Sequence, residues 1–157
     1  MNWAVAAAML MVSQAAARDL IAVHGGWGAF RDPDHCYAIA QPVGRGAARG
    51  SFASVATWPR KALRQSLHVR LSRPRDRSAG VTLSVGERRF ALVAGDRDAF
   101  AADAASDRAI VAALRSARSM SIEAVGPGGR PFADVYALTG FATAADAAAI
   151  ACMGLRR

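Results

Sequence analysis

The chain has 157 residues, a formal net charge of +8 and only two cysteines. This length favours a single domain that is large enough to bury a hydrophobic core without structural metals or several crosslinks. Nineteen of the twenty basic residues are arginine, and Lys61 is the single lysine. This balance predicts attraction to polyanions or acidic proteins, although a genome that favours arginine and alanine codons would give the same composition with a merely solvated surface.

The first seventeen residues have the pattern of a secretory signal peptide. They carry no charged side chain, contain an apolar run from Ala4 to Val12, and end in a triplet of alanines at 15–17. The lysine or arginine usual at the start of a signal peptide is missing, so the alternative is an apolar helix that stays in the fold; the run is too short to span a membrane. We therefore expect residues 1–17 to be a signal peptide and residues 18–157 to form one β-rich domain, periplasmic or secreted, without a transmembrane span.

The first half of this domain is predicted to consist of short strands. An apolar lead over 18–23 and a glycine-rich strand entry over 24–30 precede strands at 36–40 and 51–57. Residues 67–71 alternate apolar and polar side chains, as a half-buried strand does. The clearest hairpin pairs 81–85 with 89–93 across a Gly86-Glu87 turn.

The second half adds two short helices. Ser106 is expected to cap a helix that ends near Ala117, and a hairpin of 119–124 with 132–138 follows. Thr143 stands three residues before Asp146, a pattern that predicts the start of a second helix, ending at Cys152. Because short strands are joined by turns and the crossover helices of a parallel sheet are missing, the fold class expected is mainly β, an antiparallel β-sandwich or partly open barrel with two short helices in the C-terminal half.

The two cysteines bear on the compartment of the protein. In an exported chain they favour one disulfide, between Cys36 and Cys152. Two buried free thiols are the alternative if the chain stays in the cytoplasm. A metal site is disfavoured, because Cys36 and His35 are far in sequence from the other histidines and lack the paired spacing of zinc ligands. No metal and no cofactor are expected.

Several short motifs resemble the invasion-associated locus B family of exported bacterial proteins. In chain order they are Trp27, Cys36-Tyr37-Ala38, an arginine-bearing central hairpin, 109–115 leading into Ser119-Met120, and 136–141 followed by Cys152. The resemblance covers essentially the whole of 18–157 and implies an envelope or periplasmic protein with no established catalytic residues. Many members have a further cysteine just after the tryptophan, where this chain reads Gly28-Ala29-Phe30-Arg31. That departure leaves the Cys36 to Cys152 pairing and excludes an additional bridge.

No residue pattern predicts catalysis. Serine, histidine and aspartate occur outside any nucleophile-elbow setting, and the chain offers no recognisable acid/base pair. Asp134 falls on the inward side of its strand, where a carboxylate is usually hydrogen-bonded to backbone or paired with arginine. The sequence therefore predicts a non-enzymatic protein, with a hydrolase as the less favoured alternative.

Arginine supplies the main binding hypothesis. Two arginines are expected on outward strand positions and further basic residues crowd the adjoining turns, so that together they form one basic face. The candidate residues for binding an anionic partner are Arg60, Lys61, Arg64, Arg70, Arg73 and Arg89. The expected partner is an anionic envelope polymer or an acidic protein. Nucleic acid is not expected, because the chain is exported and no aromatic platform is interleaved with the basic residues. The alternative is an accessory or structural envelope protein that acts through an apolar protein interface.

Overall fold

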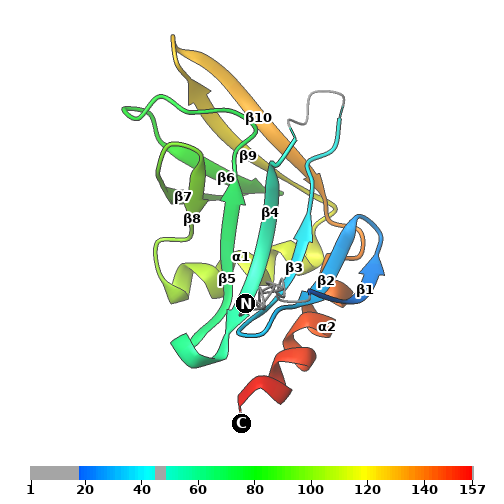
Figure 1. Cartoon of the computed structure of the whole chain (residues 1–157). Helices are drawn as coiled ribbons and strands as arrows, with labels where there is room; N and C mark the ends of the chain where they lie inside the picture. The colour runs from blue at the N-terminus through cyan, green and yellow to red at the C-terminus, as the bar shows by residue number, and fades with distance from the viewer. Residues whose placement is uncertain (1–17, 45–48, 157) are drawn as a thin grey trace, which may run out of the picture.

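A computed structural model describes residues 18–44 and 49–156, and the predicted signal peptide lies outside them. Ten strands form one antiparallel sheet in the order β1-β2-β3-β4-β5-β8-β7-β6-β9-β10. The strands are β1 Asp19–His24, β2 Trp27–Arg31, β3 Cys36–Ala40, β4 Phe52–Trp58, β5 Leu63–Arg70, β6 Val81–Val85, β7 Arg88–Ala94, β8 Asp98–Phe100, β9 Ser119–Gly126 and β10 Arg130–Ala137. The sheet curls without closing, with β1 and β10 at its two edges (Figure 1). This confirms the prediction of a mainly β fold, in its partly open form.

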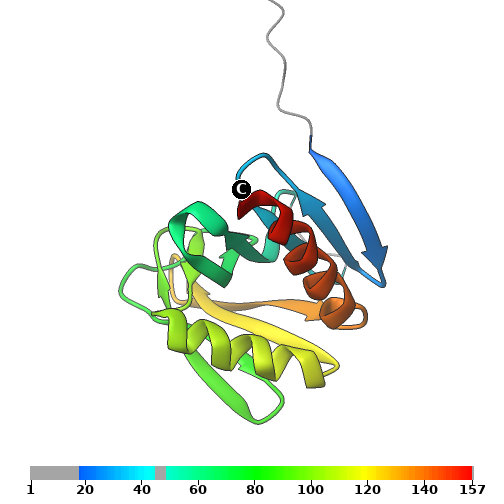
Figure 2. The same ribbon diagram turned by 90° about the horizontal axis from the view of Figure 1, so that it is seen from below.

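Two helices lie in the C-terminal half, as predicted. Helix α1 spans Ala104–Ser116 and α2 spans Phe141–Met153, and the short 3₁₀ turns η1 Pro59–Lys61 and η2 Gly154–Arg156 complete the elements. Figure 2 shows both helices in front of the strands, with α1 packed on β5 and β7 and α2 on β1, β2, β3 and β4. Among the residues that the structure describes, neither helix is long and apolar enough to cross a membrane.

The starts of both helices differ from the sequence-based expectation. Asp103, not Ser106, caps α1: the Asp103 carboxylate accepts a hydrogen bond from the Ser106 backbone N–H at 2.7 Å. Helix α2 begins at Phe141, after Gly140 in a left-handed conformation, and has no side-chain cap. The Phe141 ring is fully buried and packs edge to face on Trp27, with 4.9 Å between ring centroids. This packing extends the helix two residues before the Thr143 start.

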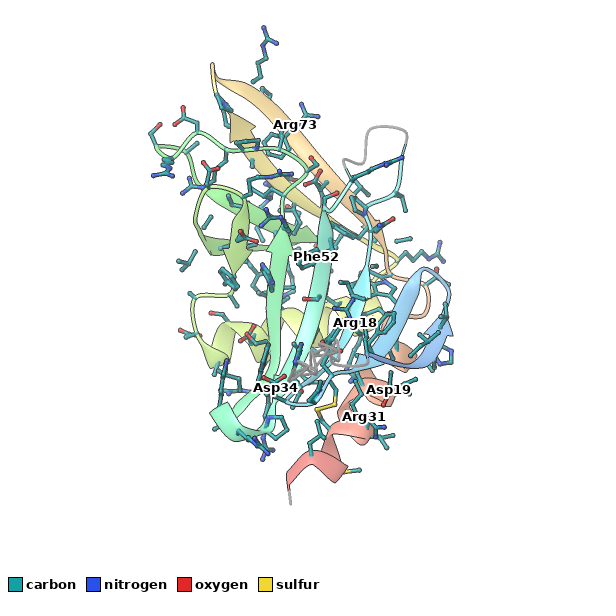
Figure 3. The ribbon with its side chains drawn as sticks, in the orientation of Figure 1. Arg18, Asp19, Arg31, Asp34, Phe52 and Arg73 are labelled. Carbon is teal, nitrogen blue, oxygen red and sulfur yellow. A yellow bond between two sulfur atoms is a disulfide. The ribbon has the colours of Figure 1, made fainter. Side chains whose placement is uncertain are left out.

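The predicted disulfide is confirmed. Cys36 in β3 and Cys152 in α2 are bonded across a Cα to Cα distance of 5.6 Å, visible as the yellow bond in Figure 3. Both residues are buried. The bond fastens the last helix to the third strand.

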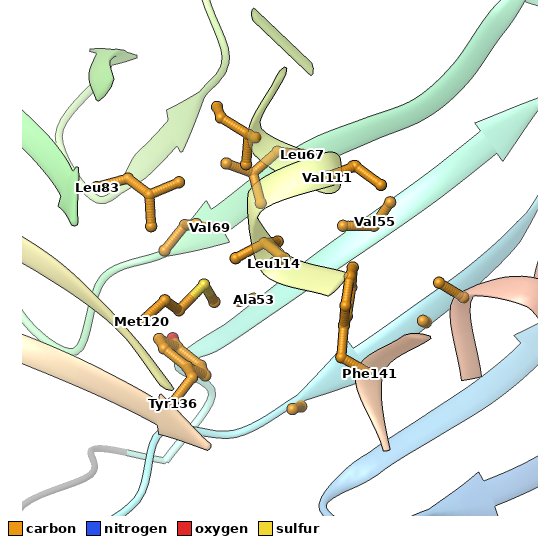
Figure 4. Packing of buried hydrophobic residues seen from close by; sticks show 14 of the residues in the cluster. Ala53, Val55, Leu67, Val69, Leu83, Val111, Leu114, Met120, Tyr136 and Phe141 are labelled. Carbon is orange, nitrogen blue, oxygen red and sulfur yellow. The ribbon is translucent and has the colours of Figure 1, made fainter. Parts of the chain in front are cut away.

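The core lies between the curled sheet and the helices. Alternation places Leu67, Val69 and Leu71 inward from β5 and its exit, as the sequence predicted. Figure 4 shows Leu67 and Val69 of β5 close to Leu114 of α1, with the Tyr136 ring of β10 nearby. Burying one such large apolar side chain contributes about 1.5–3 kcal/mol relative to leaving it in water. The inner face of the sheet therefore contributes to the stability of the fold. The outer face is not part of this core and is available for binding.

Candidate binding groove on the open face of the sheet

The two faces of strands β3, β4 and β5 have different surroundings. On the inner face, Ala38, Val55 and Leu67 are buried against the core. On the outer face, which neither helix covers, the next residues along two of these strands, Tyr37 and His68, line a groove of about 650 Å³. This volume lies in the range of sites that bind small molecules. Figure 3 views this outer face, with Phe52 and Arg18 labelled.

The register of the strands creates the hollow. Ala56 in β4 lies opposite Tyr37 in β3 and Ser66 in β5, while Ser54 in β4 lies opposite His68 in β5. Directly opposed residues in an antiparallel pair point to the same face. Small residues in the middle of the face are therefore flanked by large rings, and they form the floor of the groove.

A stack of rings forms one wall. The His35 and Trp58 rings are parallel, with centroids 3.7 Å apart, and His35 also stacks on Tyr37 at 5.0 Å. Tyr37 continues the stack to Phe30 at 5.6 Å. The Lys61 ammonium lies 4.2 Å from the Trp58 ring centroid, within cation–π distance. Because these groups contact one another's faces, a molecule in the groove meets mainly ring edges.

A second cluster forms the opposite wall. The His68 ring stacks on Phe100 at 4.6 Å and meets Phe52 edge to face at 5.0 Å. The Asp98 carboxylate lies 2.9 Å from His68 Nε2 and accepts a 2.9 Å hydrogen bond from Arg70 Nη1. Burial alone would raise the pKa of Asp98, but the hydrogen bond to His68 and the nearby Arg70 charge outweigh it and lower that pKa. The carboxylate thus fixes the His68 ring in the wall.

The carboxylates at the other end of the groove also have basic partners. Asp32 lies 3.5 Å from Arg18 Nε and 3.8 Å from His35 Nε2. Asp34 lies 2.8 Å from His35 Nδ1, and this hydrogen bond is the main reason that its pKa is lowered; the charge of Lys61 adds the smallest contribution. Within the described chain, no ion pair joins Lys61 to a carboxylate.

Two buried polar atoms of the groove lining have no hydrogen-bond partner within residues 18–44 and 49–156: the Tyr37 hydroxyl and Asp32 Oδ1, the oxygen that forms the 3.5 Å ion pair with Arg18. An unsatisfied buried polar group costs about 1–3 kcal/mol. Burial, and next the charge of Asp32, raise the pKa of Tyr37, so its hydroxyl stays protonated at neutral pH. A water or a polar group of a bound molecule would satisfy these atoms.

The six predicted basic residues do not lie together. Arg60 and Lys61 are in η1 and Arg64 begins β5, whereas Arg70 ends β5, about 20 Å away at the rise of a β-strand. Arg73 follows β5, and Arg89 lies in β7, two strands further across the sheet. Of the six, Lys61 alone lines the groove.

Besides Lys61, which lies on Trp58, three of the six contact side chains of the same chain. Arg70 holds Asp98, as described above, and Arg89 Nη1 lies 3.3 Å from a Glu123 carboxylate oxygen. The Arg73 guanidinium lies 5.0 Å from the Phe132 ring centroid. Binding of an anionic partner by these six residues remains a prediction.

The sequence analysis did not anticipate the contacts between aromatic rings and two of the basic residues. Lys61 lies on Trp58, and the Arg18 guanidinium lies 5.7 Å from the Tyr37 ring centroid. The available signal was the alternation of 52–58, which puts Phe52 and Trp58 on one face of a strand. The expectation that nucleic acid is not a partner stays a prediction.

Two buried carboxylates outside the groove have structural roles. Asp134 Oδ2 accepts the Ser72 backbone N–H at 2.8 Å, and Asp107 Oδ1 accepts that of Leu67 at 2.7 Å. Burial raises the pKa of Asp107. In the part of the chain that the structure describes, no three His, Cys, Asp or Glu side chains are grouped to hold a metal ion.

The fold and the bridge define a class: a β-rich domain with one curled open sheet, two helices and a disulfide between its third strand and its last helix. No protein-family model and no curated protein matches the sequence. The fold is similar to the crystal structure of invasion associated protein B from Bartonella henselae, with a TM-score of 0.61 over 87% of this chain and 99% of that one. The two sequences are 19% identical, so the similarity shows the shared fold alone.

Proposed function

We propose that this protein is an exported envelope or periplasmic protein, similar to invasion associated protein B, that acts by binding and not by catalysis. The observation that carries the proposal is the buried Cys36 to Cys152 disulfide within this fold. Disulfides form and persist in oxidising compartments such as the periplasm, and they are rare in the cytoplasm. The fold similarity supports the same location.

An anionic polymer or an acidic protein is the proposed partner. Arg60, Lys61 and Arg64 are exposed at the η1 end of β5, and none of them pairs with a carboxylate in the described chain. Arg70 and Arg89 contribute less, because each already lies beside a carboxylate. The basic end around η1 therefore supports the arginine-based hypothesis best.

An apolar protein interface is the second candidate, and the open face of the sheet favours it. Phe100 and Val93 lie opposite each other on neighbouring strands and are 42% and 58% exposed. Leu63, which lines the groove, is 44% exposed. Such a patch can bind a partner in a way that salt does not screen.

Intact mass measurement in the native host tests export. The expected result is a chain that has lost about the first seventeen residues, as a signal peptide does, and whose two cysteines are alkylated only after reduction. A full-length chain with two freely alkylated thiols would overturn the proposal.

Affinity capture at low and high salt tests the partner class. A partner that binds through the basic end is lost at high salt, and also when Arg60, Lys61 and Arg64 are all changed to glutamine. The control variant changes three exposed arginines elsewhere, Arg108, Arg118 and Arg130, and so removes the same charge. Equal loss in both variants would show a nonspecific charge effect, and retention at high salt would favour the apolar interface.

A further inference from the structure

We propose that the groove binds a small amphipathic carboxylate, with its apolar chain or ring in the hollow and its acid group at Lys61. The inference rests on the proposed function, because it identifies what the exported domain binds. It concerns the chemistry of the groove only, so it can fail while export and a protein partner remain correct.

The apolar body of the ligand follows from the shape and lining of the groove. The floor is formed by Ser54 and Ala56, and Ile39, Phe52 and Phe100 stand around it. Clefts of a few hundred Å³ lined mainly by apolar and aromatic groups are the usual sites for small molecules. The exposed ring edges and aliphatic carbons lose contact with water when an alkyl chain or ring fills the hollow.

The sign of the ligand charge follows from the ion pairs. The three carboxylates at the groove and its ends already have basic neighbours: Asp98 has Arg70, Asp32 has Arg18, and Asp34 has His35. Lys61 has no carboxylate partner in the described chain and lies at the edge of the groove, over Trp58. An acid group of the ligand is therefore attracted to Lys61, whereas a basic group would have to compete with the basic side chain that each carboxylate already contacts.

The Tyr37 side chain gives the ligand a second polar contact. Only 7% of Tyr37 is exposed, and its hydroxyl has no hydrogen-bond partner among the described residues. Since the hydroxyl is protonated, it can donate to a carboxylate oxygen or to a water that the carboxylate binds. Because a hydroxyl can also accept from an amine, this contact adds affinity, and the charge preference rests on Lys61.

Three probes of equal length test the proposal on the oxidised full chain: octanoate, octan-1-ol and octylammonium. Calorimetry measures affinity, and ¹H–¹⁵N spectra report position through the indole N–H signals. Trp58 lines the groove, whereas the Trp27 indole is fully buried and donates to the Ala137 carbonyl oxygen at 2.8 Å. Octanoate is expected to shift the Trp58 signal and not the Trp27 signal, and to bind about fivefold more tightly than the other two probes. The variant Trp58→Phe identifies the signal.

Two variants separate the charge from the hollow. Lys61→Gln is expected to weaken octanoate about fivefold and to leave octan-1-ol unchanged. Ala56→Leu fills the floor and is expected to weaken both probes at least about tenfold. Arg130→Gln, a distant exposed change, is the control, and near-ultraviolet circular dichroism checks that each variant keeps the native fold.

Four results would overturn the inference. The first is octanoate binding that shifts the Trp27 and Trp58 indole signals alike, or shifts neither of them. The second is an equal affinity for octylammonium. The third is a folded Ala56→Leu variant that binds octanoate as the parent does. Loss of a protein partner in Ala56→Leu without any probe binding would also reject the small ligand, and it would support the apolar interface.

Discussion

Cutting the crosslink between Cys36 and Cys152 is expected to remove a large share of the stability of the domain. The two residues are 116 positions apart in sequence, so the bridge closes a loop that includes most of the chain. In the chain-entropy account, a loop of this length restricts the unfolded state by about 5 kcal/mol at 25 °C. Domains of this size are stable by only about 5–15 kcal/mol. Reduction alone should therefore bring the fold close to the threshold of unfolding.

Urea unfolding of the oxidised protein and of the reduced, alkylated protein measures this loss. With a slope of roughly 2 kcal/mol per molar urea, the midpoint should fall by about 2.5 M. A double variant, Cys36→Ala with Cys152→Ala, should unfold near the reduced protein and should not respond to reductant. A midpoint that falls by less than about 0.5 M would refute the argument that the long loop dominates.

Three further changes test local features. Gly140→Ala should cost about 2 kcal/mol or more, because φ is +87° and a Cβ would collide with the His24 carbonyl oxygen; thermal unfolding measures it. Asp107→Ala should cost about 1–3 kcal/mol in urea unfolding, because it leaves the buried Leu67 N–H without an acceptor. The pKa of Asp98 is lower in the folded than in the unfolded protein, so Asp98 stabilises the fold above the unfolded pKa of about 3.9. This stabilisation is lost as the pH falls through the folded pKa. Asp98→Asn should therefore flatten the loss of stability in acid.

Matched controls accompany these changes. Gly86 also has a positive φ, but a Cβ at this position would meet nothing within 4 Å. Gly86→Ala should therefore reduce the free energy of unfolding clearly less than Gly140→Ala. Asp107→Asn keeps an oxygen acceptor and should recover part of the loss. Asp96→Asn makes the same carboxylate-to-amide change at an exposed residue that pairs only at 3.7 Å with Arg77, and it is the control for Asp98→Asn. Equal effects in a variant and its control would contradict the stated cause.

Local patterns predicted much of the fold. The inward alternation of Leu67 and Val69, the hairpin of 81–85 with 89–93 and the final hairpin all follow from periodicity and turn residues within short windows. The disulfide followed from the small number of cysteines. The start of α2 did not, because the burial of Phe141 against Trp27, 114 positions earlier, outweighs the capping pattern at Thr143.

The groove depends on relations that no local window contains. The hollow exists because Ala56 lies opposite both Tyr37 and Ser66, and this register is set by pairings among three strands and by an irregularity between β4 and β5. Gln65, with φ of 49°, lies at that irregularity. The sequence predicted the outward position of Arg70. It did not predict that Asp98, 28 positions later and in another strand, bonds to Arg70 and makes it less available to a binding partner.

The packing of α2 has a consequence for the order in which the chain folds. The helix covers parts of β1, β2, β3 and β4, the strands that leave the ribosome first. The inner faces of these strands and the Cys36 thiol cannot form their native contacts until more than a hundred further residues have been synthesised. During that interval the early hairpins are open to wrong pairings. The first strands therefore reach their native packing only after the last helix has formed, and oxidation of the two cysteines reports this step.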